Sequence, residues 1–309
     1  MSSGNFLFYF FMLLGPGIAV SSSEWVICWV GIELSFFGLI PLLVRDGKDV
    51  PILRRESALK YFCIQAAGRA LLICGGIIKF TIPFYRDSLP PHLILLIGLR
   101  LKLGIFPFHF WVPRVVSGVE WYSAFLILTW QKIAPFILLS NLLFRCEDLH
   151  GLVLCLGGAR AVVGAIMGLN QTKIAPILGA SSIAHRGWAV VGAVCGNFWV
   201  YFRIYCFSLG LLFLTLSKKS EFVCGMVVLS LRGLPPFVMF LGKWRILRAA
   251  LALRIPWWFV RLPLFGSIMR LFFYLKFFYS FYLESEETLH FKLGVRGALL
   301  MLTGLGGIF

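Results

Sequence analysis

Long apolar runs, separated by short charged or Pro- and Gly-containing segments, make up nearly the whole chain. A membrane-spanning helix needs about 20 predominantly apolar residues, and dividing the chain at its charged clusters leaves eleven runs of about that length. These predicted spans are Gly4–Val20, Glu24–Val44, Ala58–Phe80, Pro91–Trp111, Tyr122–Phe144, Gly151–Leu169, Ile174–Cys195, Trp199–Leu216, Phe222–Leu241, Trp257–Leu283 and Leu293–Phe309. Runs of this length favour helices over short alternating strands, so the pattern predicts an all-α polytopic membrane protein.

The connections between the predicted spans are short. The longest are Arg45–Ser57 and the stretch around Arg245–Pro256, and neither is long enough to hold a soluble domain. We therefore expect residues 1–309 to form a single transmembrane domain.

The composition supports the same class of protein. Of the 309 residues, 60% are apolar and 14% are charged, whereas soluble domains average roughly 45–50% and about 25%. The net charge of +16 comes from Lys and Arg scattered among apolar runs, which is typical of loops that face an anionic leaflet and not of a nucleic-acid-binding surface. The eight cysteines stand singly, without a CxxC pair. We expect no disulfide framework, no metal site and no redox cofactor in this chain.

Four charged side chains lie where a bilayer should exclude charge. Glu33 is in the middle of WVICWVGIELSFFGLIPLL, Lys102 follows LILLIGLRL, Lys132 lies inside FLILTWQKIAPFILL, and Lys243 ends PPFVMFLGKW. Each would cost roughly 2.5–3.5 kcal/mol at the membrane centre, so we expect these groups to be paired or hydrated. They are candidate functional residues. The alternatives are buried pairs that only orient helices and, for Lys243, snorkelling to the interface.

Proline lies near each of the three lysines. Pro107 comes five residues after Lys102, Pro135 comes three after Lys132, and a pair of prolines precedes Lys243. Proline removes a backbone donor and disrupts the preceding turn, and at membrane depth the freed carbonyls must be satisfied by protein or a wet cavity. Interrupted helices that carry charge are a recurring transporter device, although a kink for packing is the simpler alternative.

Other polar side chains also fall inside the spans. His185 lies mid-span, with Ser181 and Ser182 one turn earlier, where they could orient its ring or hold a water. It is either a hydrogen-bonded core histidine or part of a proton relay. Arg69 and Arg160 cannot usefully release a proton, because arginine stays charged. We expect them to be counter-charges to a carboxylate or a water cavity.

Six stretches follow one another along the chain: WVGIELSFFGLIPLL, KYFCIQAAGRALL, KLGIFPFHFWVP, LTWQKIAPF, GLNQTKIAPILGASSIAHRGW and LRGLPPFVMFLGKW. In order and spacing they resemble the chain 2 family of mitochondrial NADH:ubiquinone oxidoreductase (complex I). The resemblance runs from about Glu24 to Trp244, and the span count is similar to that of the animal mitochondrial form, which lacks three helices present in bacterial relatives. The chain departs from the family pattern at Arg69, Arg114, Ala175, Pro176 and Gly242.

The resemblance implies an antiporter-like fold with two discontinuous, proline-broken helices and a proton-pumping role in the membrane arm. It implies that Glu33 is the buried glutamate, Lys102 and Lys243 are the lysines of the two broken helices, Lys132 is the central lysine, and His185 belongs to the polar central axis. It also implies a multi-pass protein of the mitochondrial inner membrane that contacts other membrane-arm subunits and lipid. FMN, iron–sulfur clusters and ubiquinone would then be bound by partner subunits.

These residues lead to a hypothesis for the mechanism. A Glu33–Lys102 pair that opens and closes would set the proton affinity of Lys132 through Lys102, since desolvation disfavours a charged lysine and a nearby carboxylate favours it. Moving one charge across 100 mV takes about 2.3 kcal/mol, or roughly 1.7 pKa units, and burial can shift a lysine by up to about 3–5 units. Lys132 would hold the proton, His185 and waters would relay it, and Lys243 would pass it on.

Two other classes of function stay open. A stand-alone cation/proton antiporter would use the same buried lysines. A structural membrane scaffold would use the buried charges only to hold its helices together.

Overall fold

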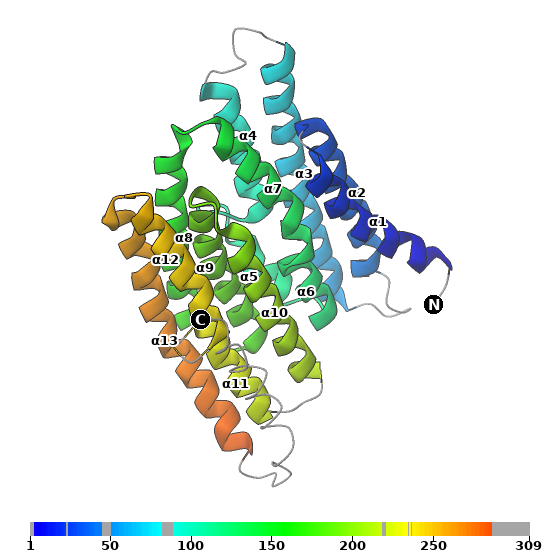
Figure 1. Ribbon diagram of the computed structural model, residues 1–309. Helices are drawn as coiled ribbons and strands as arrows, with labels where there is room; N and C mark the ends of the chain where they lie inside the picture. Colours follow the sequence, from blue (N-terminus) through cyan, green and yellow to red (C-terminus); the bar gives the residue numbers. More distant parts are fainter. Residues whose placement is uncertain are drawn as a thin grey trace. The chain divides into compact units, whose positions relative to one another are not determined.

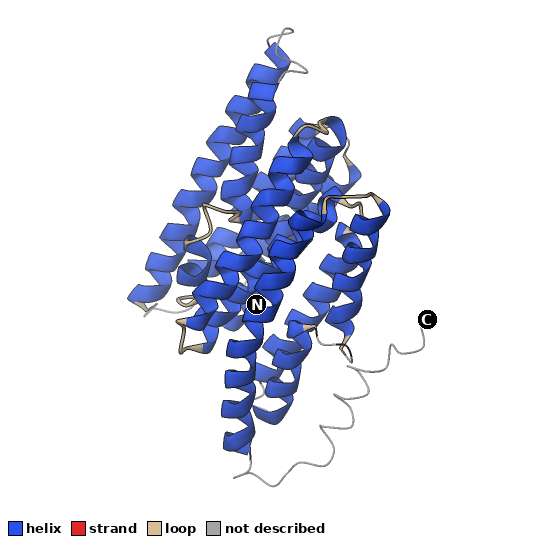
Figure 2. Ribbon diagram, turned by 90° about the vertical axis from the view of Figure 1, so that its left-hand side faces the viewer, coloured by secondary structure: helices blue, strands red, loops and turns tan. Residues whose placement is uncertain are grey.

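The computed structural model describes residues 3–22, 24–44, 51–81, 89–217, 221–233, 235 and 237–285. In this part of the chain every regular element is an α-helix and none is a strand, which confirms the all-α prediction (Figures 1 and 2). The helices are α1 (Ser3–Ser21), α2 (Trp25–Val44), α3 (Ile52–Thr81), α4 (Leu89–Leu103), α5 (Trp111–Val116), α6 (Trp121–Leu128), α7 (Trp130–Arg145), α8 (Leu149–Leu169), α9 (Ile174–Val194), α10 (Phe198–Ser217), α11 (Glu221–Arg232), α12 (Val238–Ala252) and α13 (Trp257–Ser285). The predicted span Leu293–Phe309 lies outside the described residues, and so does Pro236 of the proline pair.

Within the described ranges, six stretches are long and apolar enough to cross a membrane. They are Trp25–Val44, Ile52–Thr81, Trp121–Arg145, Leu149–Leu169, Phe198–Ser217 and Trp257–Tyr279. Two further apolar stretches, Phe6–Ser21 and Val223–Arg232, are shorter. The polytopic character of the chain follows from these helices.

Two predicted boundaries are wrong, because charged residues continue a helix where a loop was expected. α3 begins at Ile52 and not near Ala58, and Arg54 in its first turn is buried. The Arg54 guanidinium donates to the Leu43 carbonyl at 2.8 Å and pairs with Glu120 at 2.6 Å. Similarly, α12 continues to Ala252 through the stretch expected to be a connection, since RILRAALA consists largely of strong helix formers.

The chain divides into two compact units. The first consists of Met1–Val153 and Lys173–Gly179, and the second of Leu154–Thr172 and Ala180–Phe309. In the first unit α1 packs along α2, and α3 packs along α4. In the second unit α11 packs against both α10 and α13.

Glycines allow close helix crossings in each unit. A Cβ atom added at Gly68 on α3 would lie 3.2 Å from the Gly98 carbonyl oxygen on α4 and 2.9 Å from Cγ of Lys102. In the second unit, a Cβ at Gly187 on α9 would lie 2.6 Å from the Gly157 carbonyl oxygen on α8. Small residues at such crossings let backbones approach in membranes. The first crossing places the Lys102 side chain directly against α3.

The chain interrupts its helical path after α4. Gly104 adopts φ +68°, a left-handed conformation that glycine reaches without steric cost. The Ile105 N–H donates to the Arg100 carbonyl at 2.8 Å, and the Gly104 N–H donates to the Leu101 carbonyl at 3.2 Å, which is a Schellman ending. The Phe106–Pro107 peptide bond is cis, and helical structure resumes at α5.

A second interruption separates α11 from α12. α11 ends at Arg232, Gly233 adopts φ +73°, and α12 begins at Val238. At Pro135, by contrast, the expected interruption is misplaced. α7 runs through Pro135, and the break between α6 and α7 lies earlier, at Thr129. Pro135 stands in the second turn of α7, where it removes only one intrahelical hydrogen bond.

Candidate functional site

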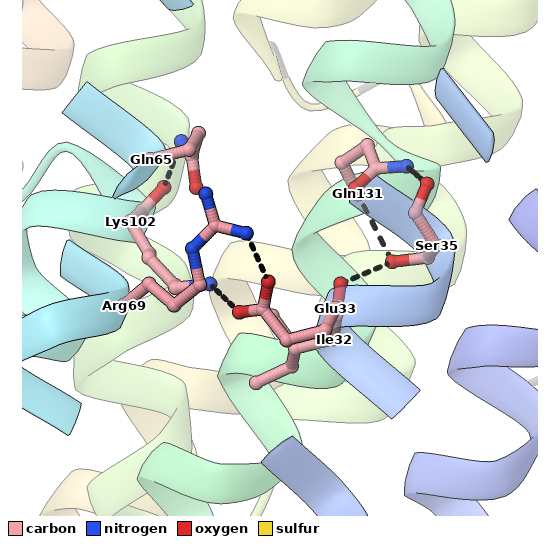
Figure 3. Close-up of polar contacts among 7 residues, drawn as sticks. All are labelled: Ile32, Glu33, Ser35, Gln65, Arg69, Lys102 and Gln131. Carbon is pink, nitrogen blue, oxygen red and sulfur yellow. Dashed lines mark hydrogen bonds and ion pairs between the residues drawn. The ribbon is translucent and has the colours of Figure 1, made fainter. Parts of the chain in front are cut away.

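The carboxylate of Glu33 lies in the middle of α2 and binds two cations (Figure 3). Its Oε1 atom is 3.1 Å from Nζ of Lys102 on α4, and its Oε2 atom is 2.7 Å from a terminal nitrogen of Arg69 on α3. Glu33 is 7% exposed and Lys102 is 2% exposed. The expected Glu33–Lys102 pair is therefore present, and Arg69 is a counter-charge to this carboxylate, as predicted.

Lys132 contacts the same region through the backbone of Lys102. Nζ of Lys132 donates to the Lys102 carbonyl at 2.6 Å, and the Gln65 side chain donates to the same carbonyl at 3.4 Å. Carbonyls in the last turn of a helix have no intrahelical partner and carry partial negative charge, so the end of α4 attracts an ammonium group. The Lys132 ammonium also lies 4.7 Å from the centroid of the Trp111 ring on α5, within cation–π range.

Ser35 and Gln131 join α2 to α7 beside these charges (Figure 3). The Gln131 amide donates to the Ser35 carbonyl at 2.9 Å, and the Ser35 hydroxyl donates to the Gln131 side-chain oxygen at 3.3 Å. The sequence analysis missed this contact. The sequence contained one signal for this contact, a glutamine next to Lys132 inside an apolar run. A buried amide is almost always hydrogen-bonded, so a partner for Gln131 was to be expected.

In the second unit, His185 lies on α9 and is 1% exposed. Its Nδ1 atom is hydrogen-bonded to the Tyr201 hydroxyl on α10 at 2.9 Å, and its ring centroid lies 5.1 Å from that of Tyr205. The sequence analysis missed Tyr201. Tyr201, Tyr205 and Ser208 recur at helical spacing along α10, and this polar stripe in an apolar helix was the signal for a partner of His185.

The hydrogen bond from Tyr201 holds the His185 ring, and the expectation that Ser181 and Ser182 hold a water or orient the ring stays a prediction. The Ser181 hydroxyl contacts the Tyr274 hydroxyl on α13, and the Ser182 hydroxyl accepts a hydrogen bond from Arg186 at 2.7 Å.

Lys243 lies on α12 and its Nζ atom donates to the carbonyl of Arg232, the last residue of α11. It is 9% exposed. A Cβ at Gly233 would lie 3.0 Å from this Nζ atom and 3.2 Å from the backbone carbon of Met239, so a larger residue here would crowd the ammonium group. A cavity of about 220 Å³ lies beside Lys243 and is also lined by Trp188 and Ser267.

The interior of the second unit is polar beyond these contacts. Buried polar atoms without a protein hydrogen-bond partner among the described residues include Nε2 of His185, the Tyr205 hydroxyl, the Ser230 hydroxyl and one terminal nitrogen of Arg270. Such groups in proteins are normally satisfied by buried water. Lys243 and Arg270 both lie within electrostatic range of His185. The arrangement suits a hydrated path for protons.

The candidate residues thus fall into two groups. The structure brings Glu33, Lys102 and Lys132 together in the first unit, and it places His185 and Lys243 in the second. Among the described side chains, no three His, Cys, Asp or Glu residues lie close enough to hold a metal ion.

A family model and individual relatives agree on the family of this chain. Residues 89–221 match a family model described as NADH:quinone oxidoreductase/Mrp antiporter, TM. NADH-ubiquinone oxidoreductase chain 2 of Albinaria caerulea is 30% identical over 303 residues, covering 94% of this chain and 96% of that protein. The chain belongs to the NADH-ubiquinone oxidoreductase chain 2 family. The member from Locusta migratoria is 34% identical over 269 residues, covering 80% of this chain and 77% of that protein.

Two solved structures share the fold of this chain. A chain of respiratory complex I from Thermus thermophilus with bound aureothin superposes with a TM-score of 0.74 and 26% identity, covering 89% of this chain and 70% of that one. A chain of the Mrp complex from Dietzia sp. superposes with a TM-score of 0.77 and 15% identity, covering 86% and 58%. The antiporter-like helical fold is thereby confirmed for this chain 2 family member.

Proposed function

We propose that this chain is a proton-translocating subunit in the membrane arm of respiratory NADH:ubiquinone oxidoreductase (complex I), located in the mitochondrial inner membrane beside other membrane-arm subunits. Its membership of the chain 2 family and its antiporter-like fold support this role. Oxidation of NADH and reduction of quinone take place in partner subunits, which carry the FMN, the iron–sulfur clusters and the ubiquinone site. The chain contributes to the enzyme by moving protons.

The observation that carries the proposal is the linkage of Lys132 to the Glu33–Lys102 pair. The carboxylate neutralises the Lys102 side chain, and the Lys102 carbonyl binds the Lys132 ammonium at 2.6 Å. When the pair is closed, Lys132 can keep its proton. When the pair opens, the uncompensated charge of Lys102 repels that proton and favours its release.

The energy available is of the required size. A charge within about 4–6 Å changes the proton affinity of a group by about 1–3 pKa units, or roughly 1.4–4 kcal/mol at 1.36 kcal/mol per unit. Moving one charge against 100 mV takes about 2.3 kcal/mol. The required energy lies within this range, so one ion pair that opens and closes can drive one proton when it shifts the pKa by about 1.7 units or more.

The remaining steps and the membrane topology belong to the same proposal. His185 and nearby waters receive the proton from Lys132, and Lys243 passes it on. The α4–α5 and α11–α12 pairs cross the membrane as discontinuous helices in a chain of eleven spans. The whole chain forms one antiporter-like domain.

The test is Lys132→Arg in the assembled complex. Arginine keeps the charge and can still donate to the Lys102 carbonyl, but it does not titrate. We expect the complex to assemble and proton pumping, measured in sealed membrane vesicles with a pH-sensitive dye, to stop. The matched control is Lys60→Arg, because Lys60 is exposed on α3 and pairs with Glu56. Normal pumping by Lys132→Arg would refute the relay and favour a scaffold.

A further inference from the structure

Two cations of different chemistry share the Glu33 carboxylate without competing for the same atom. Lys102 binds Oε1 at 3.1 Å, and Arg69 binds Oε2 at 2.7 Å (Figure 3). Either contact can therefore persist when the other is broken. Lysine can release its proton inside a protein, whereas arginine remains charged. Only the Lys102 arm of this cluster is able to titrate.

The Arg69 side chain extends from α3 and places its guanidinium against α2, the helix that carries the carboxylate. Its guanidinium carbon lies 4.9 Å from the ring centroid of Phe36 and 5.8 Å from that of Phe37, both on α2. These residues follow Glu33 by three and four positions, so they extend the same face of the helix. The guanidinium is thus held over α2, whereas Lys102 comes from α4. Lys102 can therefore leave Oε1 while the Arg69 guanidinium stays on Oε2 and over the α2 rings.

We propose that Arg69 is a positioning residue of the relay: it keeps the Glu33 carboxylate charged and fixed on α2 while Lys102 leaves or rejoins the pair. The inference rests on the proposed function. With all three groups charged, the cluster carries one net positive charge. When Lys102 leaves the pair with its charge, the remaining Arg69–Glu33 pair is neutral. Without Arg69, the same step would leave an isolated buried carboxylate, which would itself take up a proton.

Arg69 therefore decides whether Glu33 stays unprotonated when the pair opens. The charge of the released Lys102, whose carbonyl binds Lys132, then acts on the proton of Lys132 and is not cancelled by proton uptake at Glu33. A purely mechanical role for Arg69, as a tie between α3 and α2, makes no such distinction.

The experiment measures the protonation of Glu33 directly. A hydrophobic carbodiimide reacts with protonated carboxyl groups inside membranes, and the adduct on the Glu33 peptide is quantified by mass spectrometry of the assembled complex. In Arg69→Gln we expect labelling to rise at least about tenfold, because one neighbouring charge changes carboxyl protonation by one unit or more. Arg69→Lys, which keeps a charge at this position, should restore low labelling. Glu33→Gln removes the labelled group and sets the background.

The matched control is Arg54→Gln, which removes another buried arginine of α3, one that pairs with Glu120. This variant should weaken the complex and leave Glu33 labelling unchanged. Unchanged labelling in an assembled Arg69→Gln complex would overturn the inference. So would an equal rise in Arg69→Lys, which would reduce Arg69 to a tie between helices.

A second variant keeps the inference testable if Arg69→Gln does not assemble. In Lys102→Met, the closer cation Arg69 still binds Glu33 at 2.7 Å, so labelling should rise by less than about tenfold, and a larger rise would contradict the role of Arg69. These results are independent of the relay itself. Normal pumping by Lys132→Arg refutes the relay whatever the labelling shows, and unchanged labelling in Arg69→Gln leaves the relay standing.

Discussion

Replacing Gly68 by alanine should reduce proton pumping while the complex still assembles. Gly68 lies where α3 crosses α4, and a Cβ atom there would be 2.9 Å from Cγ of Lys102, 3.2 Å from the Gly98 carbonyl oxygen and 3.4 Å from Cβ of Leu101. The Lys102 atom is in the middle of its side chain, and the far end of that side chain is bound to Glu33. The new methyl group therefore displaces a segment that is held at both ends.

The size of the effect follows from these distances. Carbon atoms in contact prefer about 3.5–4.0 Å, so Lys102 must move by about 0.6–1.1 Å. A shift of that size lengthens the 3.1 Å contact with Glu33 to about 4 Å, the limit of an ion pair. Overpacking costs about 1–3 kcal/mol, and alanine regains about 0.5–1 kcal/mol over glycine in a helix. The net destabilisation is about 0–2.5 kcal/mol, which the complex should tolerate.

The assay compares protons pumped per NADH oxidised in vesicles, with assembly followed on native gels. Gly75→Ala is the matched control, because its Cβ would overpack the same pair of helices, at 3.0 Å from both Cγ and the backbone nitrogen of Leu95, without touching a charged group. We expect similar losses of thermal stability in both variants and reduced pumping in Gly68→Ala alone. Equal pumping in the two variants would show that the position of the Lys102 side chain does not control proton transfer.

Two further predictions concern the second unit. Tyr201→Phe removes the 2.9 Å hydrogen bond to Nδ1 of His185, and we expect slower pumping with normal assembly. The control is Tyr205→Phe, which should slow pumping less, because the Tyr205 hydroxyl has no protein partner among the described residues. A larger loss of pumping in Tyr205→Phe than in Tyr201→Phe would contradict the role of Tyr201. Gly187→Ala places a Cβ 2.6 Å from the Gly157 carbonyl oxygen. It should destabilise the α8–α9 crossing by about 1–3 kcal/mol, seen as a lower melting temperature of the complex, and an unchanged melting temperature would argue against this close approach.

Hydropathy predicted the elements best where a charged residue directly precedes an apolar run, as Glu24 and Lys173 do. The predicted span Glu24–Val44 corresponds to α2, and the predicted span from Ile174 corresponds to α9. Hydropathy failed where a charged side chain is buried against a partner that lies far away in the sequence. Arg54 looked like a loop residue, because its acceptor Glu120 lies 66 positions away in the sequence and no local pattern reveals it.

The ion pair of the site could be predicted from the sequence, because a buried charged side chain needs a partner of opposite charge. Among the described residues Glu33 is the one buried acidic side chain, so a deeply buried lysine such as Lys102 had few possible partners. The acceptor of Lys132 could not be found in this way, since it is a main-chain carbonyl and every residue has one. The Tyr201 contact with His185 was equally hidden, because it depends on how α9 and α10 face each other.

The binding of two lysines by helix-end carbonyls has a consequence for inherited variation in this chain. Lys132 and Lys243 are held by the main-chain oxygens of residues 102 and 232, and no missense change at those two codons can delete an oxygen of the peptide bond. Codons 104 and 233 are different, because a residue other than glycine there strains the backbone that fixes where each helix stops. At the Lys243 site, where the acceptor residue Arg232 has no other role in the relay, harmful alleles should therefore be found at Gly233 more often than at Arg232.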